Sequence, residues 1–239
     1  MTNIITIKWG TKYTSAHPNK IYQDCKNKCS FDFKFYCVTD DPTDLDAGII
    51  PLEMPTHSNL NYNDYIEDHL QRKTNMWDRP KLYLFTEFSK YFTGTNIFLD
   101  LDAEIKQDLL YLTTLPENKP WIIDMYWKMN WKEHWDKLWN GRINSSIMVW
   151  RDDQCKSITE KVLRNADDNF LKYATIDTFI GYELTDYENY NNNFFNYIPA
   201  FVFCIGRQYV PKQDEFKIVL WNSSNGAMHS GVPEVPGVD

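Results

Sequence analysis

Glycine is scarce in this sequence: the chain of 239 residues has nine, and none of them are clustered. A glycine-rich phosphate loop needs several glycines close together, because its backbone N–H groups must approach the phosphates. A metal-dependent phosphohydrolase or nucleotidyltransferase usually needs such a loop, or a larger set of acidic residues around its metals. The composition therefore argues against this class of enzyme.

Cysteine is also sparse, and the five residues (Cys25, Cys29, Cys37, Cys155 and Cys204) show no paired spacing. The Cys25-x-x-x-Cys29 stretch could begin a metal site, but no histidine or second cysteine pair completes it. We therefore expect reduced thiols, as in a cytosolic protein.

Long apolar runs are missing as well. No run approaches the ~18 residues that a membrane-spanning helix needs, and the first residues, Met1-Thr-Asn-Ile-Ile, do not form a secretory leader. Positive charge is in deficit, since 25 Lys and Arg oppose 33 Asp and Glu for a formal net charge of -8. This balance argues against nucleic acid or an anionic membrane surface as the main partner. We expect a soluble, cytoplasmic protein without a membrane span.

Hydrophobic residues, at 43% with 16% aromatics, are sufficient for a large folded core. The apolar pattern predicts strands at residues 4–7, 31–38, 49–52, 97–99, 121–123, 147–150 and 215–221, and helices at 18–28, 79–93, 109–112, 155–165 and 176–179. Strand, helix and strand in this order indicate a βαβ unit. We predict one α/β domain over residues 1–230, with a mostly parallel mixed central sheet flanked by helices, and a disordered tail at 231–239.

The stretch Ile97-Phe98-Leu99-Asp100-Leu101-Asp102 carries the strongest functional signal. It reads as a buried strand that ends in two aspartates, and ligands of open α/β sheets bind at the carboxyl ends of the strands. Two neighbouring carboxylates repel each other unless a positive charge lies between them. A divalent cation that also binds a diphosphate would supply that charge. The alternative is a strand followed by a solvated acidic turn.

The segment before this strand predicts a helix with a basic first turn. Asp78 fits the N-cap, Arg79-Pro80 opens the helix, and Gly94 ends it. Its apolar residues recur every three or four positions, at Leu82, Phe85, Phe88 and Phe92. Lys81 in the first turn could reach a diphosphate at the sheet edge, or it could be an ordinary solvated lysine.

Further polar candidates precede a strand and open a helix. Asn144 and Ser145 come directly before the predicted strand at 147–150, and Asp177 opens the helical turn at 176–179. All of them could bind a polar ligand. Alternatively, Asn144 and Ser145 are turn residues and Asp177 is a helix N-cap.

Four tryptophans recur at intervals of four residues, at 127, 131, 135 and 139. On a helix they form a broad aromatic stripe. Such a stripe packs against a protein core, or it offers a stacking platform for the apolar face of a sugar.

In order along the chain, five stretches resemble a nucleotide-sugar-dependent glycosyltransferase of the GT-A fold, a Rossmann-like α/β arrangement. The likeness is to the glycogenin and lipopolysaccharide-galactosyltransferase group and its phage-type relatives. The stretches are residues 5–13, 35–42, 81–85, 97–102 and 143–150. Asp177-Thr178 stands where these enzymes usually have Asp-Gln. No single stretch is specific, but their order covers nearly the whole chain.

The resemblance implies transfer of a sugar from a nucleoside-diphosphate sugar, with UDP favoured, to an unknown glycan, protein or small-molecule acceptor, with retention of configuration. Asp100, Asp102 and His229 would be the metal ligands for Mn²⁺ or Mg²⁺, and Lys81 and Asp177 the catalytic residues. The donor would contact Trp9, Gly10, Tyr13, Lys81, Asp100, Asn144, Ser145 and Asp177. Trp9 or Tyr13 would stack on the base, and Asn144, Ser145 and Asp177 would bind sugar hydroxyls.

The sequence departs from the family after its last strand. The family usually has a metal-binding histidine and a Lys-Pro-Trp element there, whereas this chain continues with Asn222 and its nearest histidine is His229. Either His229 reaches back, or Asn222 takes the position, or the third protein ligand is missing. Thr178 in place of Gln is a second departure. These differences leave a rival open: an inactive module that binds a nucleotide sugar or glycan on the same scaffold.

Overall fold

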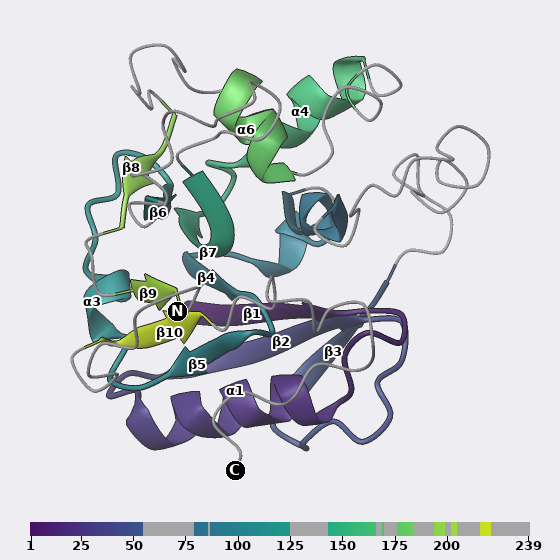
Figure 1. Cartoon of the computed structure of the whole chain (residues 1–239), viewed down its shortest axis with the longest axis vertical. Helices are drawn as coiled ribbons and strands as arrows, with labels where there is room; N and C mark the ends of the chain where they lie inside the picture. Colours follow the sequence, from purple (N-terminus) through teal and green to yellow (C-terminus); the bar gives the residue numbers. More distant parts are fainter. Residues whose placement is uncertain are drawn as a thin grey trace.

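The computed structural model describes residues 1–54, 79–85, 87–124, 143–165, 169, 176–183, 194–198, 202–204 and 216–220. Figure 1 shows a central sheet with α1 on one side and α4 and α6 together at the opposite end of the molecule. None of the helices in the described ranges combines the length and the apolar character needed to cross a membrane. The Trp127–Trp139 stripe, Asp78, Asn222, His229 and the tail at 231–239 lie outside these ranges, so the interpretations placed on them stay predictions, as do the domain boundaries.

The larger sheet has seven strands in the order β3-β2-β1-β4-β7-β6-β8. Its strands are β1 (Thr2–Lys8), β2 (Phe33–Thr39), β3 (Ile49–Glu53), β4 (Thr95–Leu99), β6 (Trp121–Asp124), β7 (Ile143–Arg151) and β8 (Asn196–Tyr197). Of these seven, β7 alone runs antiparallel to its neighbours β4 and β6. The predicted α/β architecture with a mostly parallel mixed sheet is therefore confirmed.

Helix α1 (Ala16–Lys28) crosses from β1 to β2 and covers one face of the sheet. The sequence predicts that this helix begins at Pro18. It begins two residues earlier, at Ala16 after the N-cap Ser15, so Pro18 is its third residue. Proline is tolerated there because the first-turn N–H groups have no partner within the helix. Ile21 and Cys25 pack into the core on this face, and a fully buried aliphatic side chain such as Ile21 contributes about 1.5–3 kcal/mol.

The prediction of one continuous helix before β4 is wrong. The chain forms two short 3₁₀ segments instead, η1 (Arg79–Phe85) and η2 (Ser89–Tyr91). The apolar positions are nevertheless buried as predicted, and the rings of Phe85 and Phe92 both pack edge-on against Trp150, at 5.2 and 6.4 Å between centroids.

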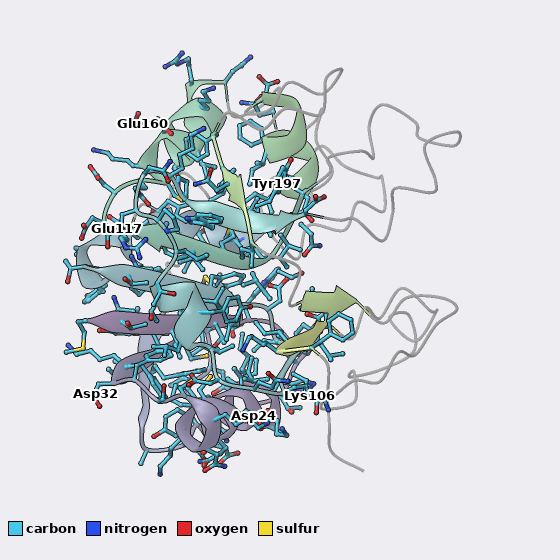
Figure 2. All side chains as sticks on the ribbon, turned by 90° about the vertical axis from the view of Figure 1, so that its left-hand side faces the viewer. Asp24, Asp32, Lys106, Glu117, Glu160 and Tyr197 are labelled. Atoms are coloured by element: carbon cyan, nitrogen blue, oxygen red, sulfur yellow. The ribbon has the colours of Figure 1, made fainter. Side chains whose placement is uncertain are left out.

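A second sheet of three strands, in the order β5-β10-β9, follows the acidic pair. It consists of β5 (Ala103–Ile105), β9 (Val202–Cys204) and β10 (Ile218–Leu220). Strand β10 lies within the predicted strand at 215–221, whereas β5 and β9 were not predicted. Lys28 near the end of α1 donates a hydrogen bond to the carbonyl of Ile105 and so ties the helix to β5. Figure 2 shows Asp24 of α1 and Lys106, just after β5, in the same part of the molecule.

Three further helices complete the described fold: α3 (Leu110–Thr113), α4 (Lys156–Arg164) and α6 (Ile176–Glu183). Each lies where the sequence predicts a helix. Figure 2 shows Glu160 of α4 and Tyr197 of β8 toward one end of the molecule and Asp24 of α1 at the other. Strand β7 begins earlier than predicted, because Asn144 and Ser145 lie within it and not before it.

Candidate active site

The carboxyl ends of two neighbouring parallel strands define the site. Strand β1 pairs with β4 in parallel, with Ile5 opposite Phe98, so the strands end at Lys8 and Leu99 on the same edge of the sheet. The loop at residues 9–15 and the Asp100-Leu101-Asp102 turn therefore leave the sheet side by side. This is the edge where open α/β sheets bind ligands.

Backbone hydrogen bonds hold the acidic turn against the sheet. The Asp100 N–H donates to the Ser146 carbonyl of β7 at 2.8 Å, and the Ala103 N–H donates to the Asp100 carbonyl at 3.0 Å. Leu101 between the two aspartates is buried in the core, with 3% of its surface exposed. Both carboxylates are thereby held at the sheet edge before the chain enters β5.

Asp102 has an unsatisfied carboxylate. Its Oδ1 atom has no solvent contact and no hydrogen-bond partner. Burial and, after it, the neighbouring charge of Asp100 raise the pKa of Asp102 to about 7, even though the charges of Lys81 and Lys12 lower it. A buried carboxylate oxygen without a partner is costly. The solvated acidic turn that we considered from the sequence does not describe this residue.

The two carboxylates fit a divalent cation, for which carboxylate oxygens are suitable hard ligands. The orphaned oxygen of Asp102 is the observation that supports the fit. Within the described residues, no group of three His, Cys, Asp or Glu side chains could hold a metal ion. A cation at Asp100 and Asp102 would then take further ligands from phosphate oxygens or water, as Mg²⁺ commonly does.

Lys81 connects the acidic turn to β7. Its Nζ atom donates to Asp100 Oδ2 at 2.9 Å, to Ser145 Oγ at 3.0 Å and to the Ser145 carbonyl at 3.2 Å. Only 7% of its side chain is exposed, so it is not the ordinary solvated lysine of the alternative interpretation. An ammonium group is a compact charge with three donors. All three donors thus have acceptors at the sheet edge.

Asp177 orients the start of β7. It is the second residue of α6, and its Oδ1 atom accepts the Ser145 N–H at 2.8 Å, while its Oδ2 atom lies 3.4 Å from Asn144 Nδ2. Asp177 therefore makes a tertiary contact and is not the N-cap considered from the sequence. Asp177, Ser145, Lys81 and Asp100 form one continuous series of polar contacts.

The loop after β1 is tied to the loop after β2. Gly10 has φ of 61°, a left-handed conformation that favours glycine, and its N–H donates to Asp40 Oδ2 at 2.8 Å. Lys8, which is 4% exposed, donates through Nζ to the Asp41 carbonyl at 3.1 Å. Trp9 between them is half-buried. The structure thus brings Trp9 and Gly10 to the same edge as the aspartates.

Tyr13 lies in the loop after β1, beside the acidic turn. Its pKa is raised well above the ordinary value, first by burial and then by the charges of Asp102 and Asp100, so the phenol stays neutral. Its ring packs edge-on against His17 with 5.0 Å between centroids. Both aromatic residues predicted to stack on a base, Trp9 and Tyr13, therefore lie in the loop that leaves the sheet beside the acidic turn.

Two residues of this edge were missed from the sequence, Lys12 and Asp40. Lys12 carries one of the two positive charges that lower the pKa of Asp102. Its position next to Tyr13 in the sequence was the only indication of a role at this edge, and a single lysine in a loop has no diagnostic pattern. Asp40 lies in the stretch 35–42, which carries part of the family resemblance, but the sequence assigned this residue no role. Its role in holding Gly10 depends on the pairing of β1 with β2.

No family model matches the sequence, and no curated protein is significantly similar to it. Solved structures are similar at the level of the fold. The galactosyltransferase LgtC, in a complex with donor and acceptor sugar analogues, matches with a TM-score of 0.55 and 12% identity over 93% of this chain and 87% of that one. Mouse xyloside xylosyltransferase 1 matches with a TM-score of 0.54 and 11% identity over 93% and 98% of the two chains.

The glycosyltransferase GlyE of Streptococcus pneumoniae gives a TM-score of 0.60 at 12% identity, over 93% of this chain and 54% of that one. These proteins share the overall fold of the chain but few identical residues. At such identities the likeness concerns the fold and not the activity. The chain therefore has the GT-A glycosyltransferase fold that its sequence predicts.

Proposed function

We propose that the chain is a metal-dependent glycosyltransferase that moves a sugar from a nucleoside-diphosphate sugar, with UDP favoured, to an acceptor with retention of configuration. The observation that carries the proposal is the series of contacts from Asp177 through Ser145 and Lys81 to Asp100, beside the unsatisfied Asp102 carboxylate. Solved glycosyltransferases of the same fold support it.

Asp100 and Asp102 would hold Mn²⁺ or Mg²⁺, and a divalent cation there would act as a Lewis acid on the diphosphate leaving group. Lys81 adds a fixed positive charge at the same edge. Because its ammonium is already held by Asp100 and Ser145, it needs little reorganisation when negative charge develops on the leaving phosphate. Preorganised charges of this kind usually give the largest single contribution to catalysis.

The sugar would lie against the start of β7. Asn144 is half-buried there, and Asp177 holds the adjoining Ser145 N–H at 2.8 Å. Carboxylate, amide and hydroxyl groups together can both accept from and donate to sugar hydroxyls. Because Asp177 is already engaged by β7, it is suited to orienting the sugar and not to acting as a free general base. Retention is proposed from the resemblance to the retaining group.

The nucleobase would lie at the loop after β1. Trp9 is half-buried beside Gly10, and Tyr13 packs on His17. Aromatic rings stack on any base, typically for about 1–3 kcal/mol per base. The Asp40 contact to Gly10 would hold this loop in place before the donor arrives.

The test is an assay of donor hydrolysis over a panel of UDP-, GDP- and CDP-sugars with Mn²⁺, followed by anomeric analysis of the transferred sugar once an acceptor is found. We expect turnover of a UDP-sugar that stops when the metal is chelated. Metal-dependent nucleotide binding without turnover of any donor would instead support the rival, an inactive binding module. The feature that favours this rival is the pair of aspartates without a third protein ligand in the described residues.

A further inference from the structure

Lys12 belongs to the site edge although the resemblance assigns it no role. It lies in the loop that follows β1, which leaves the sheet beside the acidic turn because β1 and β4 are parallel neighbours. The side chain is half-buried, and its Nζ atom lies 4.9 Å from the centroid of the Tyr13 ring. A cation–π contact of this length holds the ammonium over the ring.

The loop after β1 places this ammonium on the β1 side of the acidic turn, because the parallel strands β1 and β4 end at the same edge of the sheet. Lys81 is bound on the other flank of β4, through Ser145 of β7. The two lysines therefore approach the acidic turn from opposite flanks, and we call Lys12, Lys81, Asp100 and Asp102 the edge cluster.

The edge cluster is formally neutral, since two lysines oppose two aspartates. A divalent cation and the diphosphate of a nucleotide sugar carry equal and opposite charges, so the cluster stays balanced when both bind. The departing nucleoside diphosphate gains a further negative charge. Lys81 is engaged by Asp100 and Ser145, at 2.9 and 3.0 Å. The Lys12 side chain is partly exposed, so an anion that binds at this edge can contact it from the solvent side.

We propose that Lys12 is a second cationic ligand of the donor diphosphate, placed by the β1 loop on the flank of the acidic turn opposite Lys81. This inference rests on the proposed function and adds a residue that selects nucleoside diphosphates over monophosphates. The Tyr13 ring beneath the ammonium couples base stacking to phosphate binding. A charge-assisted contact of this type is stronger than a neutral hydrogen bond.

The test compares Lys12→Met with Lys12→Arg and with a matched control, Lys90→Met. Lys90 is also followed by a tyrosine and lies over its ring, with Nζ 5.1 Å from the Tyr91 centroid, but it is exposed and lies in η2. Both Met substitutions remove one positive charge and one cation–π contact. Each protein is titrated calorimetrically in the presence of Mn²⁺. UDP, GDP and ADP are compared first to find the preferred base, and the affinity of the nucleoside monophosphate with that base is then measured.

We expect Lys12→Met to weaken binding of the diphosphate about tenfold or more, with a change of less than about threefold for the monophosphate. Lys12→Arg keeps most of the diphosphate affinity, because the charge is retained. Lys90→Met leaves the affinities for the diphosphate and the monophosphate unchanged. Unchanged diphosphate affinity in folded Lys12→Met would overturn the inference. So would an equal loss for both nucleotides, which would mean that Lys12 only supports the loop.

A failure of the proposed function looks different. If the folded wild-type protein binds none of the three diphosphates with Mn²⁺, the proposed function and this inference fall together. If the wild type binds one of them and Lys12→Met binds it equally well, the proposed function stands and the role of Lys12 alone is rejected. Thermal unfolding of each variant shows that it is folded under the conditions of the titration.

Discussion

Strands β1 and β4 bury polar side chains at both of their ends, and the two ends differ in kind. At the amino end, Asn3 Nδ2 donates to Asn96 Oδ1 at 2.8 Å and to the Thr93 carbonyl at 3.0 Å, and Asn96 Nδ2 donates to the Phe92 carbonyl at 3.0 Å. These amides are neutral and satisfied. At the carboxyl end, Asp102 has an ionisable carboxyl group with an oxygen that lacks a hydrogen-bond partner, and burial raises its pKa to about 7.

The difference teaches how to separate structural from functional polar groups in this fold. A satisfied amide pair fixes the register of neighbouring strands and needs nothing further. A buried carboxylate that is left unsatisfied lowers the stability of the ligand-free protein, and such destabilising groups are typical of ligand-binding sites. The two ends of the same strands can therefore be tested against each other.

The largest effect is expected for Asp102→Asn, which removes a charge but keeps the shape of the side chain. We expect metal-dependent donor hydrolysis to fall by roughly 10²–10³-fold or more, as for the loss of other preorganised charges, while the fold stays intact. The exposed turn residue Asp153 offers the matched control, Asp153→Asn, which should hydrolyse the donor at the wild-type rate. Wild-type hydrolysis by Asp102→Asn, measured with Mn²⁺, would remove the metal role of this residue.

The opposite result is expected at the amino end. Asn96→Ala removes one of the two acceptors of Asn3 Nδ2 and the side-chain donor to the Phe92 carbonyl, at a cost of about 1–3 kcal/mol for each buried group left unsatisfied. We therefore expect a lower denaturant midpoint but hydrolysis within about threefold of wild type per folded molecule. A stable but inactive Asn96→Ala protein would contradict the assignment of a purely structural role to the amino end of the strands.

A smaller effect concerns pH. The folded pKa of Asp102, about 7, is raised above its ordinary value near 4, so its protonation stabilises the metal-free fold. That stabilisation is complete below the ordinary pKa and is lost as pH rises through about 7. Asp102→Asn should therefore raise the Tm of the metal-free protein more at pH 8 than at pH 5, by about 2–4 °C for each kcal/mol of relieved strain.

Differential scanning fluorimetry of both proteins at the two pH values measures this difference. Addition of Mn²⁺ at pH 8 should stabilise the wild type and narrow the gap, because the cation binds the ionised carboxylate. A gap that is independent of pH would mean that Asp102 ionises as freely in the folded protein as in the unfolded chain.

The position of the site was predictable from the sequence because it depends on local signals. An apolar run followed by Asp100 and Asp102 indicates a strand end, and parallel strands meet at one edge. Lys81 was predicted to face that edge, and the structure brings it there. Its direct contact with Asp100 could not be predicted, because that contact depends on how η1 packs over β4 and β7.

The errors have tertiary causes. Residues 79–92 show helical spacing, but they form the two 3₁₀ segments η1 and η2, and their apolar side chains are buried in the core from there. Strands β5 and β9, each three residues long, are too short to give a period. Asn144 and Ser145 look like loop residues because they are polar, yet they lie in β7, where the site uses their polar groups.

The most direct measurement of the central claim is the affinity of UDP for the wild-type protein and for Asp102→Asn, each titrated with and without Mn²⁺. If a cation held by the aspartates binds the diphosphate, Mn²⁺ will tighten UDP binding to the wild type by at least about tenfold and will have little effect on the variant. Equal UDP affinity with and without Mn²⁺ in the folded wild type would contradict the account.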